Sequence, residues 1–216
     1  MMVAYENFTE TEVLSRISNG EKKLYEIIVR RFNPALYKVG RAYNYNHEDT
    51  EDLMQETFID AYKNLKQFQG RSAFKTWLMR IMMNNCYRKK QKLSYKNEIT
   101  KDLNDNSTPM FSNSKNGADK IYQNRELGSI IENALYKIPF DYRMVFSLRE
   151  INGLNVAETA SLLSISENNV KVRLNRSKAM LRKEIEKTYS AKELFEFNLI
   201  YCDAIVKHVM EAINEL

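Results

Sequence analysis

Glycine and proline are scarce in this chain. Six glycines and three prolines among 216 residues leave little material for the tight turns that a β-rich protein needs. Few segments alternate polar and apolar residues as a half-buried strand does. The sequence therefore predicts an all-α protein.

Metal and disulfide chemistry have equally little to work with. The two cysteines, Cys86 and Cys202, stand far apart and lack the spacing of metal ligands. Two histidines add too few ligands for a zinc site. We therefore expect no metal, no other cofactor and free thiols, which fit a reducing cytoplasm.

Long apolar runs are missing as well. No apolar stretch reaches the roughly 18 residues of a transmembrane helix, so we expect no membrane span. Residues 1–19 mix Glu, Asn, Arg and Thr and lack the apolar core of a signal peptide. These absences predict a cytoplasmic protein.

Acidic residues are absent from one long stretch of the sequence. Arg71 to Lys92 holds seven Lys or Arg and no Asp or Glu, although the net charge of the whole chain is only +5. The only tryptophan, Trp77, lies there with Phe74, and Phe68 shortly precedes it. Unstacked bases bind on aromatic faces while cations hold the phosphates. This stretch is therefore a candidate for binding single-stranded nucleic acid.

The apolar spacing of the same stretch predicts a helix with one buried face. Phe74, Leu78 and Ile81 recur at intervals of four and three residues, so we assign them to the core. The opposite face carries Arg80, Asn84, Tyr87 and Arg88. A merely solvated face usually includes acids, so this face indicates an anionic ligand.

The residues before this stretch also read as helices. We predict helix over residues 9–32. Proline lacks an amide N–H, so Pro34 is expected to open a new helix, Ala35 to Tyr45, rather than to interrupt one.

The segment 47–63 carries a row of acids at helical spacing. Asp52, Glu56 and Asp60 follow one another at intervals of four. Early acids stabilise a helix N-terminus, but this does not account for Asp60, which lies two turns further in. An acidic row in a basic protein that binds nucleic acid indicates a basic protein partner. A Mg²⁺ site built from these three carboxylates, as in a nuclease, is the alternative.

The second half of the chain contains the signature of a helix-turn-helix. Residues 93–118 are polar and predict a linker, which would span roughly 85 Å if fully extended. Beyond it, Asn155 and Ser166 are expected to cap two successive helices, and Ile165 and Val170 to form a hydrophobic staple. Two short helices joined by a tight turn describe a helix-turn-helix.

The second of these helices is strongly basic. Six cations and no acid lie between Lys171 and Lys183. Its outward arc holds Lys171, Val172, Asn175, Arg176 and Ala179, flanked by Arg173, Lys178 and Arg182. On this interpretation Lys171 and Arg176 reach base edges or phosphates, Val172 meets a thymine methyl and Asn175 pairs with adenine.

With both elements in view, the chain resembles the extracytoplasmic-function (ECF) group of the bacterial sigma-70 family. The first half is similar in segments 52–58 and 68–78. The second half is similar in 138–143, in 148–154 and in the helix-turn-helix. The resemblance covers about residues 8 to 188.

The resemblance implies an initiation factor made of two small helical domains. A region 2-like domain, 8–92, would bind polymerase and melt the −10 promoter element, and a region 4-like domain, 119–188, would read the −35 element. The linker 93–118 would join them, and 189–216 would form a C-terminal extension. No catalytic residue is expected.

The resemblance also implies sites and partners. The −10 contacts would be Phe68, Phe74, Lys75, Trp77, Arg80, Asn84 and Arg88. The −35 contacts would be Lys171, Val172, Arg173, Asn175 and Arg176. Polymerase would be bound through Asp52, Gln55 and Glu56, with Asp60 in the same acidic row. The expected partners are core RNA polymerase, at its β′ coiled coil and β-flap, promoter DNA and, where one exists, an anti-sigma factor.

Two points stay open at this level. A helix-turn-helix regulator that works without polymerase is the alternative function, although such a regulator leaves the Phe68 to Trp77 segment unexplained. The tail beyond residue 189 predicts an amphipathic helix, with Leu199, Val206 and Ile213 on its apolar face. That helix would either pack on the second domain or bind a regulator.

Overall fold

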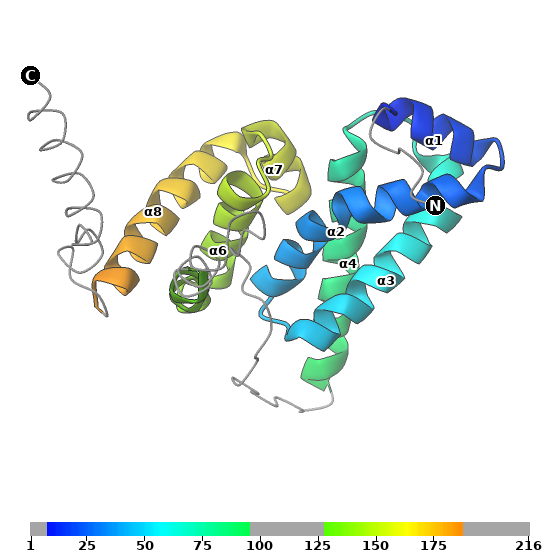
Figure 1. Cartoon of the computed structure of the whole chain (residues 1–216). Coiled ribbons are helices and arrows are strands. Elements are labelled where there is room, and N and C mark those ends of the chain that lie inside the picture. The colour runs from blue at the N-terminus through cyan, green and yellow to red at the C-terminus, as the bar shows by residue number, and fades with distance from the viewer. Residues whose placement is uncertain (1–7, 96–127, 188–216) are drawn as a thin grey trace, which may run out of the picture.

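The computed structural model describes residues 8–95 and 128–187, and every regular element among them is a helix (Figure 1). The all-α prediction is confirmed. Most of the predicted linker and the predicted C-terminal helix lie outside the described residues. Among the described ranges, no helix combines the length and apolar character that crossing a bilayer requires.

Four α-helices and two short 3₁₀ turns build the first half. In order they are α1 (Glu10–Ser18), η2 (Lys22–Leu24), α2 (Tyr25–Ala42), α3 (His47–Lys63), η3 (Leu65–Gln67) and α4 (Phe74–Tyr95). Helices α2, α3 and α4 pack against one another (Figure 1). Helix α4 continues three residues into the segment predicted as linker.

Local signals in the sequence explain where α1 and α3 begin. Thr9 caps α1 in a capping box with Glu12, and the Asn46 side chain caps α3 by accepting from the Asp49 amide. Such caps satisfy amides that have no partner within the helix. The predicted core residues Phe74 and Leu78 are buried, whereas Ile81 is only half-buried.

The prediction for Pro34 is wrong, because α2 runs through it without a break. An interior proline removes one backbone hydrogen bond and costs about 3 kcal/mol. Ile28, Phe32 and Leu36, on both sides of the proline, are buried, and each such side chain contributes about 1.5–3 kcal/mol. Packing on α3 and α4 thus outweighs the local preference, while Pro34 itself faces solvent.

The described part of the second half begins with a helix over 128–136. It continues with α6 (Phe140–Phe146), a π-helical turn η4 (Ser147–Ile151), α7 (Val156–Leu163) and α8 (Glu167–Glu186). Both predicted caps are confirmed: Asn155 forms a capping box with Glu158, and Ser166 caps α8. Ile165 packs in the same cluster as buried Val170, as the predicted staple requires.

The turn between α7 and α8 depends on one unusual backbone conformation. Ser164, which ends α7, has φ +53°, in the left-handed region. This residue reverses the chain so that α8 can begin at Glu167 after its Ser166 cap. Helix α8 then packs against both α6 and α7, completing the helix-turn-helix.

The two halves also share buried surface. Met144, Leu148 and Leu154 of the second half lie in the same apolar cluster as the buried side chains of the first half. Helix α2 packs against η4, and α4 packs against α7.

Candidate nucleic-acid interface

The predicted aromatic residues come together at the start of α4. The ring centroids of Phe68 and Phe74 are 5.2 Å apart, and Trp77 lies 5.3 Å from Phe68 and 5.4 Å from Phe74. Gly70, with φ +68°, turns the chain between Phe68 and the helix. Phe74 is buried, whereas Phe68 and Trp77 remain partly accessible.

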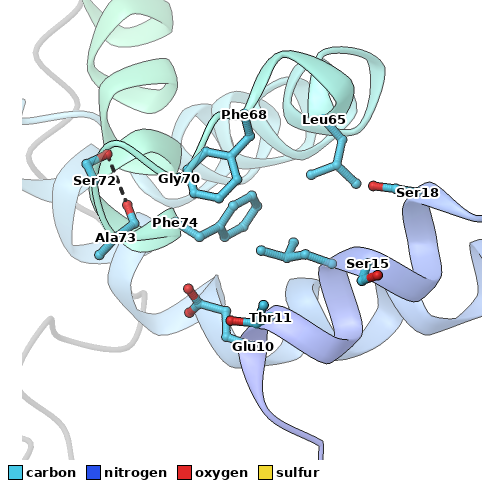
Figure 2. A pocket seen from close by; sticks show the side chains of 11 residues that line it. Glu10, Thr11, Ser15, Ser18, Leu65, Phe68, Gly70, Ser72, Ala73 and Phe74 are labelled. Atoms are coloured by element: carbon cyan, nitrogen blue, oxygen red, sulfur yellow. Dashed lines mark hydrogen bonds between the residues drawn. The ribbon is translucent and has the colours of Figure 1, made fainter.

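A pocket of about 550 Å³ opens beside the rings of Phe68 and Phe74 (Figure 2). On one side it is lined by the segment from Leu65 to Phe74, including Phe68 and Gly70. Its volume falls in the range of roughly 300–1,000 Å³ that is typical of small-molecule sites. A single unstacked base on an aromatic wall is a ligand of suitable size and shape.

The opposite wall of this pocket comes from α1, which the sequence analysis did not assign to any site. Its polar lining residues there are Glu10, Thr11, Ser15 and Ser18 (Figure 2). The sequence does carry a sign of this arrangement: Val13, Leu14 and Ile17 form the buried stripe of α1, which leaves hydroxyl-bearing positions at its margin. What lies opposite that margin depends on tertiary packing.

The predicted −10 residues along α4 do not all face one way. Lys75 is half-buried and donates to the Asn152 carbonyl of the second half. Burial, and secondarily the nearby Lys38, lower the pKa of the Lys75 amine. Arg80 donates to the Ser161 hydroxyl at 2.9 Å, while Asn84 is exposed.

Arg88 faces α3 instead. Its guanidinium lies 3.5 Å from Glu56 and 3.6 Å from Asp60, and it donates to Asn85. Two members of the acidic row therefore have a cationic partner within the chain, which the sequence analysis did not foresee. A guanidinium against two of the three carboxylates also disfavours a Mg²⁺ ion at that place.

The side chains proposed to meet polymerase are mostly exposed to solvent. Asp52, Gln55 and Glu56 are exposed, and Asp60 is half-buried. Gln55 also borders an apolar groove of about 700 Å³ between α2 and α3. Ile59 lines this groove with 54% of its surface exposed. Sequence spacing does not reveal this groove, because Tyr25 and Val29 on its far side belong to another helix.

The predicted basic arc of α8 is largely open. Lys171, Val172, Asn175 and Arg176 are exposed, as the outward arc requires. Arg173 is the exception, since its guanidinium pairs with Asp141 of α6 at 3.2 Å and is mostly buried. Four of the five predicted −35 residues therefore lie on one exposed face of α8, and the fifth, Arg173, faces α6.

A base-sized aromatic pocket and an open basic helix-turn-helix on one chain define a helical nucleic-acid-binding protein in two parts. The sequence matches Sigma-70 region 2 over residues 28–94 and Sigma-70, region 4 over residues 129–181, together more than half of the chain. The chain belongs to the sigma-70 family, in its extracytoplasmic-function group.

Curated relatives agree with this assignment along most of their length. The chain is 26% identical over 185 residues to the ECF RNA polymerase sigma-E factor of Haemophilus influenzae, which covers 84% of this chain and 97% of the relative. It is 27% identical over 188 residues to the protein of the same name from Escherichia coli K12, covering 84% and 96%.

Solved structures support the fold. CnrH in complex with the cytosolic domain of CnrY has a TM-score of 0.59 at 21% identity, covering 82% of this chain and 97% of that one. RpoE of Bartonella quintana in complex with the anti-sigma factor NepR also has a TM-score of 0.59, at 19% identity, covering 76% and 98%.

Proposed function

We propose that this chain binds core RNA polymerase and directs promoter-specific initiation as an ECF-type sigma factor. One observation carries the proposal: the chain joins a base-sized aromatic pocket beside a basic helix to an exposed basic helix-turn-helix. A regulator that binds only duplex DNA needs the helix-turn-helix, but it leaves the aromatic pocket without a role.

The first half would recognise and help to melt the −10 element. An unstacked base would enter the pocket between α1 and the rings of Phe68 and Phe74, and Trp77 packs against both rings. Lys75, Arg80 and Asn84 on α4 would hold the adjoining strand, and Arg88 would join them only if it left Glu56 and Asp60. Stacking of one base on an aromatic ring is worth roughly 1–3 kcal/mol, enough to offset part of the cost of unpairing it.

The second half would read the −35 element with the exposed arc of α8. Recognition helices of this kind place their N-terminal residues against base edges in the major groove. Lys171, Val172, Asn175 and Arg176 lie in the first half of α8, on its exposed side. Arg173 would contribute only if it left Asp141.

The acidic row and the neighbouring apolar groove would face polymerase. Asp52, Gln55, Glu56 and Asp60 would meet the β′ coiled coil, and the second half would meet the β-flap.

An anti-sigma factor is a further proposed partner, since the solved RpoE structure holds the anti-sigma factor NepR. We assign no catalytic step to the chain, because polymerase itself makes the RNA. We place the chain in the cytoplasm, because it would work there with polymerase.

In vitro transcription with core polymerase tests the proposal. The template would be a DNA library randomised at the −10 and −35 positions, so that no promoter sequence is assumed. We expect RNA only when the chain is added, from templates that share two short sequences.

A DNA-binding assay without polymerase is the control for this experiment. The chain without polymerase should bind duplex library DNA weakly and without enrichment of a palindrome. Strong, palindromic enrichment without polymerase, combined with no chain-dependent RNA, would replace the proposal with the regulator hypothesis.

A further inference from the structure

The pocket beside Phe68 and Phe74 has a single charged side chain in its lining, Glu10 of α1. Glu10 is half-buried, and within residues 8–95 and 128–187 no hydrogen bond or ion pair engages its carboxylate. Figure 2 shows Glu10 toward the Phe74 end of the pocket and Ser18 toward the Leu65 end. The pocket therefore holds an unused hydrogen-bond acceptor beside an aromatic wall.

Three hydroxyl groups lie on the same wall as Glu10. Thr11, Ser15 and Ser18 follow one another at intervals of four and three, so they share one face of α1. All three residues are exposed, and no partner among the described residues binds their hydroxyl groups. A hydroxyl can donate or accept, whereas a carboxylate only accepts. The carboxylate is thus the group on this wall that can distinguish one ligand edge from another.

A carboxylate in this position disfavours a phosphate inside the pocket, because like charges repel. No Lys or Arg lines the pocket to offset that repulsion. The lining instead suits an uncharged, flat group that stacks on Phe68 and hydrogen-bonds to α1. A nucleobase fits this description, with its phosphates left outside the pocket near the cations of α4.

Glu10 also lies in the first turn of α1, where an acid stabilises the helix N-terminus. Glu26 has the equivalent place in the first turn of α2. Glu26, however, is exposed, pairs with Arg30 and lines neither this pocket nor the groove between α2 and α3. The two glutamates therefore share the helix-end role and differ in access to the pocket, so their comparison separates the two roles.

We propose that Glu10 determines which bases this pocket accepts, by accepting a hydrogen bond from an exocyclic amino group. Cytosine, adenine and guanine carry such a group, whereas thymine presents carbonyl oxygens in its place, and these repel a carboxylate. The pocket is therefore selective against thymine. That its occupant is an extruded base rests on the proposed function; the role of Glu10 rests on the lining of the pocket.

Selection of this kind follows from how extruded bases are bound in proteins. Such a base is held by stacking and by hydrogen bonds to its Watson–Crick edge. A site that is built to bond one polar group of its ligand rejects an analogue that lacks the group, because the site is then left with an unpaired polar atom. Cytosine and uracil provide the matched pair, since they have the same size and differ in the amino or carbonyl group at C4.

The chain carries its own probe for this test. Trp77 is the only tryptophan, and its ring lies 5.3 Å from Phe68 and 5.4 Å from Phe74, the two aromatic residues of the pocket. A base that stacks in the pocket should therefore change its fluorescence. Full-length wild type, Glu10→Gln and the control Glu26→Gln would each be titrated with oligodeoxycytidine and with oligodeoxyuridine of equal length. Both variants lose one negative charge.

We expect wild type to bind the cytidine strand roughly tenfold more tightly than the uridine strand, which is at the low end of discrimination by base-edge hydrogen bonds. Glu26→Gln should keep this ratio. In Glu10→Gln the ratio should fall close to one, because an amide accepts from cytosine and donates to uracil. Its uridine affinity should also rise above that of Glu26→Gln, and a loss of folding cannot produce such a gain.

A wild-type ratio near one, equal ratios in the two variants, or no fluorescence response to either strand would overturn the proposal. The titrations contain no polymerase, so they are independent of the transcription experiment. Chain-dependent RNA synthesis without base selectivity would reject the role of Glu10 alone. Selectivity that depends on Glu10, without any RNA synthesis, would reject the proposed function and leave the base site in place.

Discussion

Cys86 lies in the middle of α4 with its side chain in the core. Burial raises the pKa of its thiol to about 12, from an ordinary value of 9.0. The folded chain therefore holds this proton more tightly than the unfolded chain does. The stability that results is fully present below the unfolded pKa of 9.0 and is lost as pH rises toward about 12.

This shift predicts how the thiol reacts and how stability depends on pH. In a Cys202→Ser background, iodoacetamide at pH 8 should modify Cys86 slowly in buffer and rapidly in urea. Between pH 9 and 11, unfolding free energy should fall more steeply than in a further Cys86→Ala variant, by up to about 1.4 kcal/mol per pH unit. Buried tyrosines titrate in both proteins and therefore do not cause a difference between them. Parallel slopes would contradict a raised pKa of the Cys86 thiol.

Arg176 and Arg173 stand three residues apart on α8 but differ in surroundings. Arg176 is exposed on the arc, whereas Arg173 pairs with Asp141. With polymerase present, Arg176→Ala should weaken the binding free energy at the −35 element by roughly 1–3 kcal/mol. It should also relax the sequence preference at one base pair of that element. Arg173→Ala should change that preference less. Run-off transcription from templates varied at −35 measures both, and the reverse ranking would reassign the contact to Arg173.

At the scale of the element, the crossing of α2 and α3 depends on Gly40. A Cβ at this position would lie 2.6 Å from the Thr50 Cγ2 and 3.1 Å from the Met82 Cε. Thr50 is fully buried, and its hydroxyl donates to the Asn46 carbonyl at 2.7 Å. The side chain therefore has little room to move aside.

Gly40→Ala is expected to destabilise the fold even though alanine favours a helix. The gain in helix propensity is about 1 kcal/mol, but overpacking a core typically costs about 1–3 kcal/mol. We expect a net loss in urea unfolding that Thr50→Ser, which removes the opposing methyl, partly restores in the double variant. A single variant more stable than wild type would show that α2 and α3 separate readily.

Across the whole molecule, opposite charges are divided between surfaces. Basic side chains of α4 and α8 form the proposed DNA contacts, and the acidic row of α3 forms the proposed contact with polymerase. Arg88 joins the two, because it lies on α4 yet pairs with Glu56 and Asp60. Reversing Glu56 would also set it against Arg88. Asp52 has no ion-pair or hydrogen-bond partner among the described residues and is therefore the cleaner probe.

Asp52→Lys should weaken binding to core polymerase roughly tenfold, which corresponds to about 1.4 kcal/mol. The reason is that a new cation would face a basic partner. Binding of random single-stranded DNA should not weaken. Glu26→Lys, an equal charge change at an exposed site on α2, is the control. Competition against labelled wild type measures both, and equal losses would move the docking surface away from α3.

Most of the helices and their buried faces could be predicted from local sequence patterns. Thr9, Asn155 and Ser166 cap helices in the structure, and Phe74 with Leu78 forms a buried stripe. These features depend on residues within about one turn of each other, so spacing alone reveals them. The two nucleic-acid elements were found in the same way, from charge and aromatic content along single helices.

The contacts that those faces make depend on the packing of the whole fold. It kept Pro34 inside α2, made α1 a wall of the aromatic pocket, turned Arg173 toward Asp141 and set the second half against Lys75 and Arg80. Each of these outcomes depends on partners that lie tens of residues away or on packing summed over several helices. No local periodicity records such contacts, because the spacing within one helix is the same whichever surface it finally touches.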